Sequence, residues 1–156
     1  MLKMAIWLQI LINIVFSIIG SMGFALTINV PRRALFLTGI SGACGWMTYW
    51  VLIRLHSGRM IANLVGAFVI GMLGLFFARI KKCPVSVFNI PALVPLVPGA
   101  PAYMAVRALV QGKYDVAEDL MLRVGIITVA IALGFLLSTL QSEFIYRLKM
   151  HYKNKQ

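Results

Sequence analysis

The chain has 156 residues, of which 61% are hydrophobic and only 12% are charged, and its mean hydropathy is +0.90. Soluble domains usually carry about 25% charged residues and about 45–50% apolar ones. The composition therefore excludes a soluble enzyme, a secreted disulfide scaffold and a disordered chain. The formal net charge is +11. Loops that flank membrane spans explain this excess, so we expect no nucleic-acid partner.

The charged residues leave five long uncharged runs, each close to the roughly 20 residues that a membrane-spanning helix needs. These runs are residues 4–31, 34–53, 60–78, 83–106 and 124–142. We expect an all-α, polytopic membrane protein, with residues 1–156 in a single membrane domain. The expected spans are 4–28, 34–53, 60–78, a broken fourth at 84–106, and 120–142. The first run exceeds the roughly 7–15 residues of a signal-peptide core, so it is expected to be a retained span.

The loop charges predict an orientation in the plasma membrane. If all five runs cross, the side that receives the basic tail at 147–156 also receives the larger share of Lys and Arg. If 83–106 does not cross, this bias disappears. We therefore expect five crossings, with the N-terminus outside and the C-terminus in the cytoplasm. Whether 84–106 crosses fully or re-enters stays open.

Polar side chains recur every four residues along the first run. Gln9, Asn13, Ser17 and Ser21 share one face of a helix. Because lipid cannot satisfy amides and hydroxyls, this polar stripe should face protein or water. It either makes interhelical hydrogen bonds or forms one wall of a hydrophilic path.

Small residues recur along the second and third runs at helical spacing. The second run has Gly39, Gly42 and Gly45, and the third has Ala62 with Gly66, Ala67 with Gly71, and Gly74 with Ala78. Such spacings let helix backbones approach closely. Close packing is the favoured interpretation, and space for a substrate or for helix sliding is the alternative.

The fourth run is rich in proline. Its prolines are Pro84, Pro91, Pro95, Pro98 and Pro101. A proline inside a helix costs about 3 kcal/mol. We expect a short first piece, an unwound stretch near 91–100 with a type II turn at Pro98–Gly99, and a half-helix from Pro101 that Gly112 ends. Irregular backbone at membrane depth survives only where protein buries it or water reaches it, as at transporter binding sites.

The N-terminus of that half-helix could bind a carboxylate. We expect free amides around Ala102 and Tyr103 to act as donors, with Arg107 on the same face as Tyr103. The candidate substrate-binding residues are Asn89, Pro95, Pro98, Gly99, Ala102, Tyr103 and Arg107. The alternatives are a purely structural kink and an Arg107 that reaches to the membrane surface.

The last run is preceded by acidic residues. Asp115 with Glu118 resembles a capping box, so a helix should begin there and continue into the span. No acid lies inside the five runs, so a proton relay would use Asp115, Glu118 or Asp119, or another subunit. We expect no metal, no cofactor and no enzyme activity, because no metal-ligand cluster, nucleotide-binding loop or catalytic triad is recognisable.

Two stretches, GFALTINVPRRAL at 23–35 and PALVPLVPGAPAYMAV at 91–106, resemble the small subunit of the threonine/serine exporter family. The likeness covers about residues 15–145. It implies efflux of small polar amino acids such as threonine and serine, or of related small organic acids. It also implies a larger membrane partner of the same family, and a homo-oligomer is a further arrangement to consider.

Two function classes remain from the sequence. The leading hypothesis is a subunit of an exporter of small carboxylated metabolites. The alternative is a membrane scaffold or assembly subunit that does not transport. A scaffold has no need of a costly proline-broken span, which favours transport.

Overall fold

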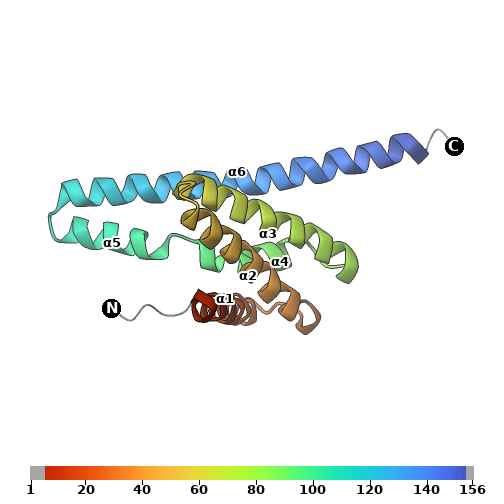
Figure 1. The fold of residues 1–156 in the computed structure, drawn as a ribbon, viewed down its shortest axis with the longest axis horizontal. Helices are drawn as coiled ribbons and strands as arrows, with labels where there is room; N and C mark the ends of the chain where they lie inside the picture. Colours follow the sequence, from red (N-terminus) through yellow and green to blue (C-terminus); the bar gives the residue numbers. More distant parts are fainter. Residues whose placement is uncertain (1–5, 154–156) are drawn as a thin grey trace.

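The computed structural model describes residues 6–153, with side chains up to residue 145. Within this range the chain forms helices only (Figure 1). They are α1 (Ile6–Thr27), α2 (Arg32–Arg54), α3 (Arg59–Lys81), α4 (Ser86–Ala92), the 3-10 helix η1 (Val94–Leu96), α5 (Gly99–Val110) and α6 (Tyr114–Lys153). The predicted basic tail at 147–156 lies outside the described side chains.

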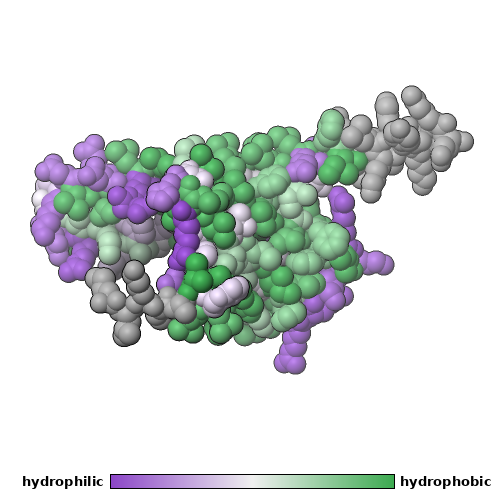
Figure 2. Space-filling model, viewed as in Figure 1, coloured by the Kyte–Doolittle hydropathy of each residue, from purple (hydrophilic) through white to green (hydrophobic). Residues whose placement is uncertain are grey.

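Four of these helices are long and apolar enough to cross a membrane: α1, α2, α3 and α6. The segment α4–η1 and helix α5 meet at an angle of 59° and count as a fifth span if they are taken together. Figure 2 shows a hydrophobic band between hydrophilic ends of the molecule. The predicted all-helical membrane architecture of about five spans is confirmed, with the fifth span counted when the bent pair is taken as one.

Close backbone packing holds the bundle together, as the small residues predicted. All the glycines and alanines singled out in the second and third runs are buried. A Cβ atom added at Gly42 would lie 2.0 Å from Ser21 Oγ of α1, and one at Gly45 would lie 2.4 Å from Ile70 of α3. One at Gly71 would lie 2.1 Å from Ser138 of α6. The bundle therefore has no space for even one added methyl group at these crossings.

The broken segment is less unwound than predicted. We expected irregular backbone near 91–100, but α4 continues through Pro91 and η1 includes Pro95. Pro95 lies in the first turn of η1, where its missing N–H would have no helical acceptor, so it costs little there. Beyond Pro91, the Leu93 N–H donates to Asn89 O at 3.1 Å and keeps α4 regular.

The break itself is a tight turn at Pro98. The Gly99 N–H donates to Val97 O at 2.8 Å, and Pro98 has φ −76° and ψ 54°. These values define an inverse γ-turn. The predicted type II turn is wrong, because it needs a positive φ at Gly99, and Gly99 has none. Helix α5 accordingly begins at Gly99 rather than at Pro101.

Helix α5 ends where the sequence predicted, at Gly112. This glycine has φ +72°, and its N–H donates to Leu109 O at 3.0 Å. The Lys113 N–H donates to Ala108 O at 2.9 Å. The two bonds form a Schellman motif, which ends α5 and turns the chain back into α6.

Helices α5 and α6 form a hairpin that projects from one end of the bundle (Figure 1). Among the described elements α5 packs on α6 alone, through the buried side chains of Ala105 and Ala108. With 40 residues α6 is about 60 Å long, roughly twice the thickness of a bilayer core. It begins at Tyr114, so Asp115 lies inside the first turn and the predicted capping box is wrong.

Candidate functional site

A cavity of about 290 Å³ opens beside the break, and we call it the break cavity. It is lined by Trp46, Tyr49 and Ile53 of α2, Arg59 and Asn63 of α3, residues 95–101, and Ile127 of α6. Residues 95–101, with the γ-turn at Pro98, form one wall. The opposite walls supply an aromatic pair, Trp46 and Tyr49, whose ring centroids are 5.2 Å apart.

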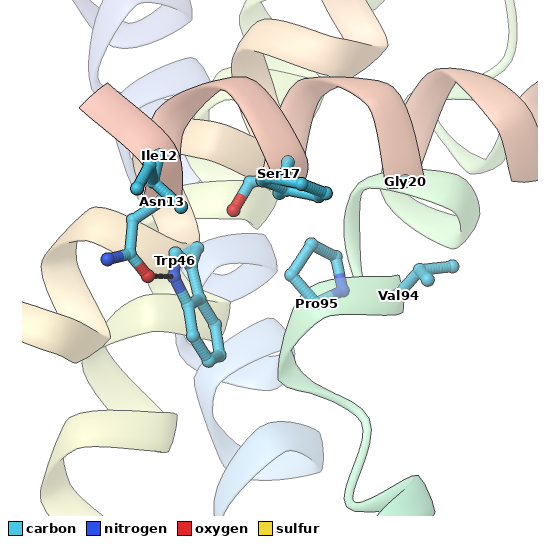
Figure 3. Close-up of a pocket in the computed structure, with 8 residues that line it drawn as sticks. Ile12, Asn13, Ser17, Gly20, Trp46, Val94 and Pro95 are labelled. Atoms are coloured by element: carbon cyan, nitrogen blue, oxygen red, sulfur yellow. Dashed lines mark hydrogen bonds between the residues drawn. The ribbon is translucent and has the colours of Figure 1, made fainter. Parts of the chain in front are cut away.

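A second cavity of about 260 Å³ lies between α1, α2 and η1, and we call it the stripe cavity (Figure 3). It is lined by Ile12, Asn13, Phe16, Ser17, Gly20, Trp46, Val94 and Pro95. Trp46 Nε1 donates to Asn13 Oδ1 at 2.7 Å, which holds the indole ring between the two cavities. Pro95 also lines both cavities, so one residue pair separates them.

The polar stripe of α1 faces protein. Ser17 and Ser21 are buried, and Asn13 Nδ2 donates to Gln9 O at 2.7 Å. Arg54 of α2 donates to the side-chain oxygen of Gln9. The stripe thus makes interhelical hydrogen bonds at Gln9 and Asn13, and it also forms a cavity wall at Asn13 and Ser17.

The structure brings together only part of the predicted substrate-binding set. Pro95, Pro98 and Gly99 line the break cavity. Asn89 lies apart on α4, where its Oδ1 is buried without a hydrogen-bond partner in the described chain. Tyr103 and Arg107 lie on the exposed part of α5, and Tyr103 is 69% exposed.

The predicted amide donors need a correction. The Ala102 N–H donates to Pro98 O at 3.0 Å and is therefore not free for a ligand. The Gly99 N–H is used by the γ-turn, and Pro101 has no N–H. In this first turn of α5, the Ala100 N–H is the amide left for a ligand in the break cavity.

Sequence reasoning missed Arg59 and Asn63, which lie far from the prolines along the chain. A signal was present, because Asn63 is the one amide or charged side chain in residues 60–78. Only the fold shows that α3 begins opposite the break. No group of three or more His, Cys, Asp or Glu that could hold a metal ion is found in the described residues.

Comparisons with known proteins identify a family for the chain. Residues 13–141 match the family described as "Threonine/Serine exporter, ThrE". A protein of Haemophilus influenzae described as "Uncharacterized protein" is 33% identical over 104 residues, which are 67% of this chain and 35% of that relative. The match thus spans about a third of the relative's length, and no solved structure matches the chain. Because the family match covers most of the sequence, the chain belongs to the threonine/serine exporter family.

Proposed function

We propose that this chain is a membrane subunit of an exporter of small polar amino acids, threonine and serine in the first place, or of related small organic acids. The family supports an exporter role. The observation that carries the proposal is the break cavity, because it joins a broken membrane segment to a basic and an amide side chain. Broken helices of this kind build substrate sites in transporters.

The substrate would enter at the break and pass the Pro95–Trp46 pair. Pro95, Pro98 and Gly99 form the wall of the break cavity, and the stripe cavity with Asn13 and Ser17 continues beyond that pair. A small carboxylate would meet the Ala100 N–H on the break side. Ser21 and Asn89, each with a buried oxygen that has no partner in the described chain, would offer further polar contacts deeper in the bundle.

The chain would work with a larger membrane partner of the same family. The Haemophilus influenzae relative extends well beyond the matched part, which is consistent with such a partner being joined to it there. Among the helices that the structure describes, α5 packs on α6 alone, and it exposes Tyr103, Val106 and Val110. Tyr103 and Arg107 would contact substrate only if another subunit covered this face of α5. The larger partner is the first candidate for the subunit that covers it, and a second copy of this chain is the other.

Release of threonine and serine from cells tests the proposal. Cells that lack their own exporters would carry both subunits or each subunit alone. We expect fast release only with both subunits. Equal release from cells with both subunits and from cells with the partner alone, despite normal membrane abundance of this chain, would contradict a transport role for this chain.

A further inference from the structure

We propose that the break cavity binds an α-amino acid as a zwitterion, with the Arg59 guanidinium on its carboxylate and Asn63 Oδ1 on its ammonium group. The inference rests on the proposed export function and, of the two substrate classes named there, selects amino acids over organic acids by the contacts that each end of the ligand would make. It assigns the carboxylate and the ammonium group of the ligand to two residues of α3 that lie one helical turn apart.

Arg59 is a cation without a partner in the part of the chain that the structure describes. Two other arginines, each in the last turn of a helix, do have partners. Arg54 stacks at 3.8 Å over the Trp50 ring, and Arg79 donates to Ser142 Oγ at 2.9 Å. Arg59 instead lines the break cavity, where its guanidinium can meet an anion.

The position of Arg59 in its helix increases its need for an anion. It is the first residue of α3, where the helix dipole places partial positive charge and where acidic residues are favoured. The first turn of α3 contains no acid. Helix α5 begins at the same cavity, so the Ala100 N–H adds a second donor. A bound carboxylate would relieve the mutual repulsion of these positive groups.

Asn63 supplies the complementary acceptor. Its side chain is only 3% exposed, yet it lines the cavity. Asn63 Nδ2 donates to Arg59 O at 2.7 Å, which fixes the amide so that Oδ1 is the atom left to accept. An ammonium group donates hydrogen bonds and cannot accept them, so it suits this oxygen.

The remaining lining limits the ligand. No Asp or Glu of the described side chains lines the cavity, so a free amine without a carboxylate would meet Arg59 with no compensating charge. The volume of about 290 Å³ lies at the lower end of the range for small-molecule pockets, which favours a short side chain. These features together select a small zwitterion over a simple amine or a large amino acid.

Efflux from proteoliposomes that contain this chain and its larger partner tests the inference. The vesicles would be loaded with L-serine, with glycerate, which replaces the ammonium by a hydroxyl, or with L-serinamide, which lacks the carboxylate. We expect the unmodified chain to export L-serine at least tenfold faster than either analogue. Loss of a charge-assisted hydrogen bond typically changes binding by about 10- to 100-fold.

Three variants separate the two contacts. Arg59→Gln should slow L-serine and glycerate efflux alike by about 10- to 100-fold, and Arg59→Lys should retain part of the rate because it keeps the charge. Asn63→Leu should slow L-serine more than glycerate, because the hydroxyl of glycerate donates a weaker hydrogen bond to Oδ1 than an ammonium group does. The control Arg123→Gln removes an exposed arginine of α6 and should change neither rate.

The outcomes distinguish this inference from the proposed function. L-serine efflux that continues unchanged in Arg59→Gln, or glycerate efflux as fast as L-serine efflux in the unmodified chain, would overturn the zwitterion site and leave the exporter standing. If the unmodified chain with its partner moves neither L-serine nor L-threonine, the proposed function fails and the zwitterion site fails with it.

Discussion

At Gly74 of α3 there is no space for a methyl group, because Asn89 of α4 occupies it. A Cβ added there would lie 1.8 Å from Asn89 Oδ1 and 2.9 Å from its Cγ. The same Oδ1 is buried and has no hydrogen-bond partner in the described chain. The contact therefore joins a steric constraint to an unsatisfied polar atom, and it can be tested by a pair of substitutions.

Gly74→Ala should lower the free energy of unfolding by about 1–3 kcal/mol, the usual cost of overpacking. Asn89→Ala removes the clashing atoms, so the double variant should recover most of that loss. Thermal unfolding of the purified protein in detergent measures both effects. Gly125→Ala is the matched control, because a Cβ there meets nothing within 4 Å and should be neutral or slightly stabilising.

Equal destabilisation by Gly74→Ala in the presence and absence of Asn89 would contradict the α3–α4 packing. Efflux by Asn89→Ala is a separate measurement. A slower rate with an unchanged melting temperature would assign Asn89 to the transport path.

The element that most distinguishes this chain is the bent segment from α4 to α5. Proline at residue 98 has no N–H to donate to the carbonyl of Val94, and the γ-turn bends the segment by 59°. Pro98→Ala with Gly99→Ala restores both the donor and helix propensity. A straight conformer of this segment should be stabilised by about 3 kcal/mol relative to the bent conformer. This changes the ratio of the two populations by roughly 100-fold.

We expect the Pro98→Ala, Gly99→Ala double variant to export L-serine about tenfold or more slowly at unchanged membrane abundance. Efflux from cells that carry the partner measures the rate, and immunoblotting of membranes measures the abundance. Unchanged efflux at normal abundance would reject the break as a transport site.

The sequence predicted these elements unevenly. Hydrophobic runs and small-residue spacing predicted the spans and their buried faces, because both depend on local composition. Gly112 was correctly predicted as the end of α5, because only a glycine-like φ suits that position. The unwound stretch was predicted too long, since the cost of a proline depends on where a helix starts, and Pro95 falls in a first turn.

The site was predicted only in part for a different reason. Pro95, Pro98 and Gly99 lie within five residues of the chain, and the proline-rich composition of that stretch identifies them. Arg59 and Asn63 join them only because α3 begins opposite the break. Tyr103 was predicted to be near the ligand because it follows the break closely in sequence, but α5 leads it out along α6.

Across the whole molecule, the loops gather at two ends. The α2–α3 loop and the α5–α6 turn lie toward one end, and the start of α2, the α3–α4 turn and the C-terminal part of α6 lie toward the other (Figure 1). We propose that the first end faces outside, because Arg32, Arg33 and the basic end of α3 lie at the other.

Cysteine labelling tests this orientation. In a chain with Cys44 and Cys83 replaced by alanine, Ser57→Cys and Lys113→Cys should both react with a membrane-impermeant thiol reagent added to intact cells. Both residues lie outside the helices, in the loops of the outward-facing end. Labelling of either position from the cytoplasm alone would contradict the five-crossing topology.

The claim on which the account depends most is that the break cavity holds the substrate. Its most direct test uses Ala100→Cys, a cavity position, in the same cysteine-free chain assembled with its partner. We predict that L-serine slows thiol modification at residue 100 and leaves modification at residue 113 unchanged. Modification at residue 100 that proceeds at the same rate with and without L-serine, in a complex that still exports it, would contradict the account.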